Sequence, residues 1–111
     1  LFHLLAPERV VCSPVNVGGG FVRCAHGLLP VPAPATARLL EDVPAYAGAE
    51  VGELCTPTGA ALLAHFAAVF SALPTGRICG VGYGMGKKDF AALNCLVSFL
   101  CFLFILSSVF F

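Results

Sequence analysis

The sequence contains no tryptophan and few charged side chains, and the shortage of charge limits the kinds of partner that the protein can bind. Six of its 111 residues are Lys or Arg and six are Asp or Glu, so the formal net charge is zero. No basic run is longer than Lys87-Lys88, whereas a nucleic-acid-binding surface needs enough cations to neutralise a row of phosphates. We therefore expect no nucleic-acid partner.

The start of the chain has no initiator methionine and no secretion signal, and the cysteines are not closely paired. The first residue is Leu1 and not methionine, so we treat the chain as a fragment of a larger domain that has lost an upstream portion. The first residues contain no charged segment followed by a cleavage site, so nothing in them indicates secretion. The six cysteines form no CxxC pair, which favours small buried thiols kept reduced in a cytosol, with metal ligation as the alternative. They are Cys12, Cys24, Cys55, Cys79, Cys95 and Cys101.

Several short runs of residues predict strands. Residues 9–17 (RVVCSPVNV) are rich in β-branched side chains and end at three consecutive glycines, as a strand that enters a tight loop does. Residues 21–24 predict a second extended piece. Residues 77–81 predict another strand, which a glycine-rich loop follows.

Two helices are predicted between these strands. Residues 35–41 follow Pro34 and are stopped by a Val-Pro pair, so this helix is short. The second is placed by Thr56 as N-cap and Pro57 at the first helical position, with apolar residues at helical spacing up to residue 70. Strands that alternate with helices predict a mixed α/β (α+β) fold, with a small sheet and short helices.

The end of the chain is unusually apolar. Hydrophobic residues make up 59% of the sequence, above the usual level of about 45–50% for a soluble domain, and the excess lies in residues 90–111, which carry no charge. As a helix this segment would reach about 30 Å, enough to cross a bilayer core. Wrong-frame translation and a core strand-helix unit without its partners are the alternatives.

Three motifs resemble one protein family. Residues 12–36 read CSPVNVGGGFVRCAHGLLPVPAPAT, residues 52–63 read GELCTPTGAALL, and residues 81–90 read VGYGMGKKDF. In this order they are similar to segments of the nickel-insertion proteins of the nickel-pincer cofactor pathway (the LarC family), and the likeness runs from Val10 to Leu96. We therefore expect residues 1–96 to form a partial family region and residues 97–111 to be an apolar tail outside it.

The resemblance implies a reaction and its participants. Members of that family insert nickel into a pyridinium-3,5-bisthiocarboxylic acid mononucleotide, using CTP with a divalent cation (Mg or Mn), and form a nickel–carbon bond flanked by two sulfurs. It also implies a cytoplasmic enzyme of the lyase class, whose product serves lactate racemase-type apoproteins. The family's opening aspartate segment, histidine-rich stretch and C-terminal nucleotide domain are absent from the sequence, so we expect the fragment alone to be inactive.

Candidate residues for metal and proton transfer lie inside the motifs. Imidazole is a suitable nickel ligand, and His26 follows the glycine turn in the most family-like stretch, although a loop histidine bonded to backbone is the alternative. Glu53 is the acid inside the second motif and is our candidate base, with a solvated carboxylate as the alternative.

Candidate residues for the nucleotide are those able to bind phosphate. Backbone amides of Gly18, Gly19 and Gly20, together with the Arg23 guanidinium, suit an anion. So does the helix start formed by Thr56, Thr58 and Gly59, and Lys87 adds a point charge. A tight turn and a simply capped helix are the competing interpretations.

Two other functions remain open on the sequence alone. A non-enzymatic carrier module would bind nickel through His26 without consuming CTP. A small membrane-anchored protein would insert residues 90–111 into lipid.

Overall fold

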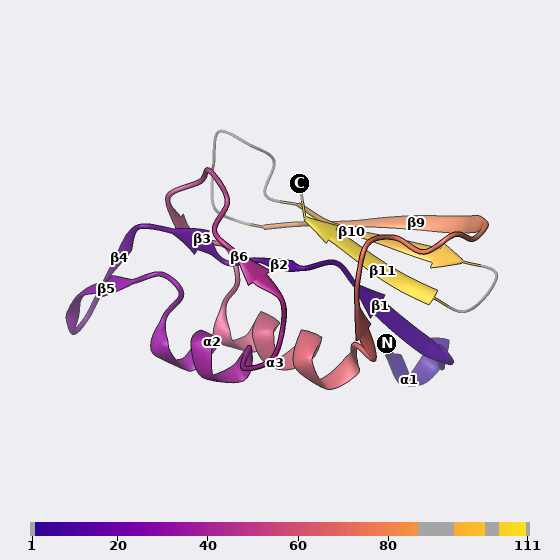
Figure 1. Cartoon of the computed structure of the whole chain (residues 1–111), viewed down its shortest axis with the longest axis horizontal. Coiled ribbons are helices and arrows are strands. Elements are labelled where there is room, and N and C mark those ends of the chain that lie inside the picture. Colours follow the sequence, from indigo (N-terminus) through magenta and orange to yellow (C-terminus); the bar gives the residue numbers. More distant parts are fainter. Residues whose placement is uncertain (1, 87–94, 102–104, 111) are drawn as a thin grey trace.

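The computed structural model describes residues 2–86, 95–101 and 105–110, and it confirms the mixed α/β class. Short helices lie along one side of a chain of small sheets, and a larger sheet occupies one end (Figure 1). A projecting hairpin occupies the other end of the molecule.

The larger sheet has five strands in the order β8-β1-β11-β10-β9. Strand β1 is parallel to both β8 and β11, while β10 is antiparallel to β11 and to β9. Its strands are β1 (Arg9–Cys12), β8 (Val69–Phe70), β9 (Ile78–Met85), β10 (Cys95–Cys101) and β11 (Ile105–Phe110). The glycine-rich stretch after residue 81, expected to be a loop, is therefore mostly strand, because pairing with β10 holds it extended.

Three two-stranded sheets carry the middle of the chain. The first pair is parallel and the other two are antiparallel. They are β2 (Val15–Asn16) with β6 (Ala45–Tyr46), β3 (Gly18–Gly19) with β7 (Gly52–Glu53), and β4 (Phe21–Cys24) with β5 (Gly27–Pro30). The single strand predicted before the glycines is thus divided, because its segments pair with different partners.

The helices are α1 (Phe2–Leu5), α2 (Pro34–Leu39) and α3 (Pro57–Phe66). The predicted Thr56 cap is confirmed, since the Thr56 side chain accepts a hydrogen bond from the Gly59 amide at 3.2 Å and Pro57 opens the helix. Helix α3 ends before residue 70, because Ala68 donates its amide to the Val10 carbonyl at 2.8 Å and the chain turns into β8.

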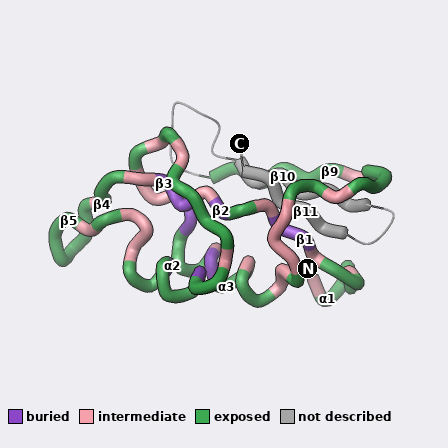
Figure 2. Tube along the Cα trace, viewed as in Figure 1, coloured by how far each residue is buried: buried purple, intermediate pink, exposed green. Residues whose placement is uncertain are grey.

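The hydrophobic core lies where β2 and β3 meet α2 and α3 (Figure 2). Five buried side chains form it: Val15, Val17, Leu40, Cys55 and Ala60. Thr36 is fully buried beside them and donates its hydroxyl to the Cys55 carbonyl at 3.3 Å, which ties α2 to the start of α3. Satisfying that carbonyl inside the core avoids the cost of an unpaired polar group.

The prediction of a C-terminal helix in the apolar tail is wrong. Residues 95–101 and 105–110 are strands, and they fill the sheet between β1 and β9. An uncharged apolar run suits a buried strand as well as a helix. Here the run is extended because strands that are distant in the sequence supply its backbone partners. In the part of the chain that the structure describes, no helix has the length and apolar character needed to cross a membrane.

Candidate functional site

The centre of the predicted site is the junction of β3 and β7, which we call the β3–β7 site (Gly18, Gly19, Gly52 and Glu53). Gly18 pairs with Glu53 and Gly19 with Gly52, so residues far apart in the sequence lie directly opposite. Gly18 has φ +82°, and a Cβ built on it would collide with the Gly52 carbonyl oxygen. This glycine is therefore required by the close approach of two backbones.

Asn16 fixes the turn from inside and was not among the predicted site residues. Its Oδ1 accepts hydrogen bonds from the amides of Gly18 and Gly48, each at 3.1 Å. The signal in the sequence was an asparagine two residues before a glycine, a spacing that suits an Asx turn. Because the Gly18 amide already donates to Asn16, that amide is not open to a phosphate.

Glu53 is half-buried and lies close enough to Cys55 to influence its ionisation. Burial, the negative charge of Glu53 and the neighbouring Cys12 raise the pKa of the Cys55 thiol to about 11, so the thiol is neutral at pH 7. Cys12 and Cys55 are buried as expected, whereas Cys24 and Cys79 are exposed. A neutral, enclosed Cys55 is a core side chain and not a ready metal ligand.

The start of α3 follows three residues after Glu53. The Gly59 amide is engaged by Thr56 and the Ala60 amide by the Thr56 carbonyl, at 3.2 and 2.9 Å. Pro57 has no amide hydrogen, so Thr58 supplies the remaining donor of this first turn, and its side chain is exposed. The turn predicted to bind phosphate is a capped helix with one amide left over.

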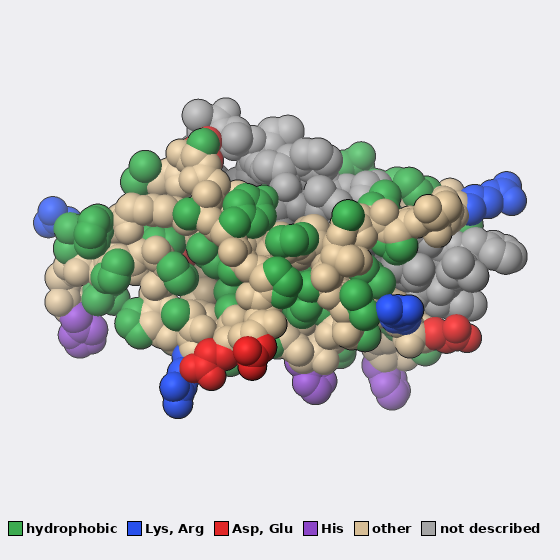
Figure 3. Space-filling model, in the orientation of Figure 1, with side chains coloured by type: hydrophobic (Ala, Val, Ile, Leu, Met, Phe, Trp, Pro, Cys, Tyr) green, Lys and Arg blue, Asp and Glu red, His purple; other side chains and the backbone are tan. Residues whose placement is uncertain are grey.

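Arg23 and His26 belong to the β4–β5 hairpin. Arg23 pairs with Leu28, and His26 sits in the turn between Cys24 and Gly27. Both side chains are exposed, and the hairpin projects from the body of the molecule (Figure 1). Hydrophobic side chains gather around the basic group at this end of the surface (Figure 3).

The predicted site residues thus divide into groups. Strand pairing joins Gly18, Gly19 and Glu53, while the α3 turn follows in sequence and the hairpin carries its own two residues. Lys87 lies outside the described residues. Within residues 2–86, no set of three or more His, Cys, Asp and Glu side chains is arranged to hold a metal ion.

Comparison with known proteins now bears on this arrangement. The family model described as "Nickel insertion protein" matches residues 1–107. A "Putative nickel insertion protein" of Methanosarcina barkeri is 48% identical over 101 residues, covering 89% of this chain and 26% of that protein. A "Pyridinium-3,5-bisthiocarboxylic acid mononucleotide nickel insertion protein" of Desulfitobacterium hafniense is 53% identical over 95 residues, covering 86% of this chain and 24% of that protein.

The chain therefore spans about a quarter of the length of these curated relatives. No solved structure matches it. The match nevertheless covers the β3–β7 site, the β4–β5 hairpin and α3 together. On this evidence the chain belongs to the nickel insertion protein family.

Proposed function

We propose that this chain is part of a CTP-dependent nickel insertase that acts on pyridinium-3,5-bisthiocarboxylic acid mononucleotide. The observation that carries the proposal is the family match over residues 1–107, together with 53% identity to a protein named for that substrate. The reaction replaces a ring carbon–hydrogen bond by a nickel–carbon bond, as expected of a lyase-class cyclometallase. Its product is the nickel-pincer cofactor.

In this proposal Glu53 is the base. The electron pair of the ring carbon–hydrogen bond forms the bond to nickel, and the proton passes to the carboxylate. Backbone pairing with Gly18 holds the residue in place, which supports the role because a base must be fixed within hydrogen-bond reach of the proton it removes.

His26 is the proposed ligand that delivers nickel as a substrate. Its exposure at the hairpin turn leaves the imidazole open to a metal ion. Because no three-residue metal group exists among residues 2–86, His26 would supply one ligand and the substrate's two thiocarboxylate sulfurs would complete the set.

CTP and its Mg or Mn ion fit the described residues only in part. The amides of Gly18 and Gly59 already donate within the fold, which weakens these two as phosphate donors. Arg23 and the Thr58 amide are the donors that we retain, with Gly19, Gly20, Thr56 and Lys87 as neighbours of the nucleotide. CTP would supply a phosphoanhydride bond, and Arg23 would hold its phosphates through charge-assisted hydrogen bonds.

The proposal also covers the cellular compartment, the longer protein and the partner of this chain. The chain acts in the cytoplasm as one piece of a longer protein, is inactive alone, and serves the apoprotein of a lactate racemase-type enzyme. The length of the relatives, about four times that of the matched segment, supports the fragment assignment.

The test measures nickel incorporation into the mononucleotide by mass spectrometry, using the complete protein with and without CTP. Glu53→Gln is expected to lower the yield by about 10²–10⁴-fold, the usual loss of a general base. His26→Ala is also expected to lower it, through loss of a nickel ligand, and both variants should keep an unchanged circular dichroism spectrum. Glu50→Gln and His65→Ala are matched controls, since each removes a neighbouring acid or another exposed imidazole. Wild-type yields from both test variants would refute the site, and equal yields without CTP would support a carrier instead.

A further inference from the structure

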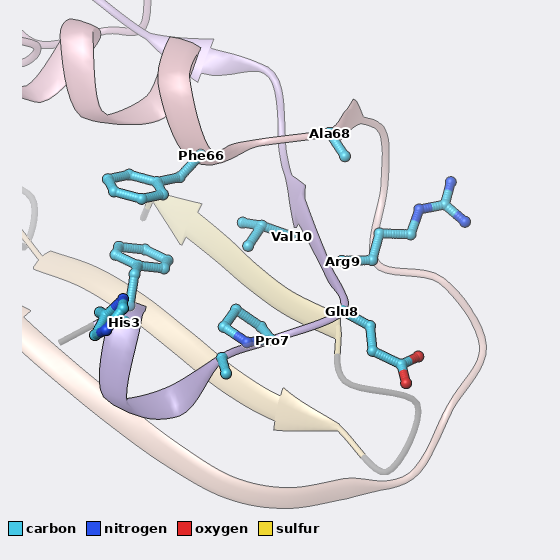
Figure 4. Close-up of a pocket in the computed structure, with 9 residues that line it drawn as sticks. His3, Pro7, Glu8, Arg9, Val10, Phe66 and Ala68 are labelled. Atoms are coloured by element: carbon cyan, nitrogen blue, oxygen red, sulfur yellow. The ribbon is translucent and has the colours of Figure 1, made fainter.

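Two apolar surfaces lie outside the predicted site, and the first is an open pocket that we call the Phe2–Phe66 pocket (Figure 4). It has a volume of about 610 Å³ and lies between α1, the start of β1 and the end of α3. Phe2 and Phe66 stack on each other, with ring centroids 4.1 Å apart. Glu8 and Arg9 point away from the Phe66 ring (Figure 4). The two rings are therefore partners of each other, and the lining selects no particular ligand.

The second surface is strand β9, which forms an open edge of the larger sheet (Figure 1). Among the described residues β9 pairs with β10 alone, so the N–H and C=O groups of alternate residues point outwards along its other side. Its eight residues span about 27 Å at about 3.4 Å per residue. They include no charge and no proline, which commonly protect an edge, whereas the opposite edge, β8, is two residues long.

The sequence of β9 alternates between apolar residues and glycine. Successive side chains of a strand point to opposite faces, so one face of β9 is apolar and the other is largely bare backbone. The apolar face consists of Cys79, Val81, Tyr83 and Met85, and the bare face includes Gly80, Gly82 and Gly84. Tyr83 is 71% exposed and Met85 is 65% exposed. The body of the chain therefore leaves the apolar face of this strand uncovered.

Gly82 lies at the middle of this strand without a requirement for glycine within the chain. Its φ lies outside the left-handed region, and nothing lies within 4 Å of a Cβ built on it. Glycine weakens a strand interior, and there it often marks the close approach of another backbone. A strand from outside the described part of the chain would account for this choice of residue.

The pattern of β9 is self-complementary when the strand pairs with a second copy. In an antiparallel pair about a two-fold axis, directly opposite residues have their side chains on the same face. Centred on Gly82, this pairing sets Val81 opposite Tyr83, an aromatic and a β-branched residue, which are favourable cross-strand partners. Cys79 then faces Met85, glycine faces glycine, and no like charges meet.

We propose that β9 is a self-association edge, through which two copies of this chain join their five-stranded sheets antiparallel about Gly82. The second copy supplies an extended backbone for the outward N–H and C=O groups, and its uncharged strand suits an edge without charge. Both apolar faces come to lie on the same side and form one continuous strip. A contact of one strand on each side belongs to the small interfaces, below about 1,200 Å², so the dimer is weak and depends on concentration.

The first test is sedimentation equilibrium of the full chain over a wide range of concentration. The average mass should rise with concentration from the 11.5 kDa of one chain towards twice that value. A single-chain mass at every concentration would overturn self-association and would leave the edge to a strand of the longer protein.

Charge variants show whether β9 is the surface involved. Val81→Lys combined with Tyr83→Lys, both at exposed positions, sets like charges opposite each other and should raise the Kd of the dimer at least about tenfold. Val81→Glu combined with Tyr83→Glu should do the same. A mixture of the two double variants pairs Lys with Glu and should restore the dimer, which misfolded chains would not do. Leu62→Lys, at an exposed apolar position of α3, is the matched control and should leave Kd unchanged.

Cross-linking tests the register. Gly82→Cys, in a chain whose exposed Cys24 and Cys79 are replaced by serine, brings two Cβ atoms to about 4.5–5.5 Å, and a small shift then permits a disulfide. Oxidation should give a covalent dimer. Gly76→Cys, in open space outside β9, is the control and should stay monomeric. Equal cross-linking of both variants, or association unchanged in both charge variants, would overturn the proposal.

Discussion

The glycine turn offers a direct test of whether close backbone packing governs the β3–β7 site. We consider Gly18→Ala. Gly18 has φ +82°, and an added Cβ would meet the Gly52 carbonyl, with the Leu54 amide nitrogen 3.2 Å away. The substitution therefore forces a left-handed backbone on alanine and pushes β3 away from β7 at the same time.

The magnitude follows from these two effects. A positive φ costs an L-residue about 1–2 kcal/mol, and relieving an overpacked contact costs about 1–3 kcal/mol. Separation of the strands also threatens the bond from the Leu54 amide to the Val17 carbonyl, now 3.3 Å long, which is worth about 1 kcal/mol. Together these predict a loss of about 2–5.6 kcal/mol, after about 0.4–1 kcal/mol is returned through the less flexible unfolded chain.

Two other glycines isolate the contributions. Gly27 has φ +107° with nothing within 4 Å of a built Cβ, so Gly27→Ala tests backbone strain alone and should cost about 0.5–1.5 kcal/mol. Gly76 has open space and no positive φ, so Gly76→Ala should stay within about 0.5 kcal/mol of wild type. Urea unfolding followed by circular dichroism, with equal m-values, measures all three. If Gly18→Ala costs no more than Gly27→Ala, the close approach of β3 to β7 is wrong.

Three further predictions concern the core and the start of α3. Thr36→Val removes the donor to the Cys55 carbonyl and should cost about 1–3 kcal/mol in urea unfolding, while Thr36→Ser keeps the hydroxyl and should retain that hydrogen bond. Thr56→Ala removes the cap on the Gly59 amide and should cost about 1 kcal/mol, while Thr56→Ser should be near neutral; equal losses in both would contradict the cap. Because the Cys55 pKa is raised in the folded protein from 9.0 to about 11, its contribution to stability is full below pH 9.0 and is lost as pH rises towards 11. Urea midpoints measured across that interval should fall in wild type and fall less in Cys55→Ala.

Local chemistry alone determined part of this protein. Thr56 and Pro57 specify the start of α3 because a side-chain oxygen and a fixed φ act within one turn, and that prediction is confirmed. Family membership was likewise readable from ordered motifs in the sequence, and the family model confirms it. The functional roles of His26, Arg23 and Glu53 stay predictions.

The tertiary structure decided what depends on partners far along the chain. Gly18 must be glycine because the Gly52 carbonyl approaches it, and Asn16 matters because it also reaches Gly48. Residues 95–101 and 105–110 are strands because β1 and β9 offer backbone partners on either side, although their composition suited a helix equally. The Phe2–Phe66 pocket exists because the ends of α1 and α3 meet over β1. These contacts cannot be predicted from the sequence pattern, since strand pairing and packing bring together residues that are far apart in the sequence.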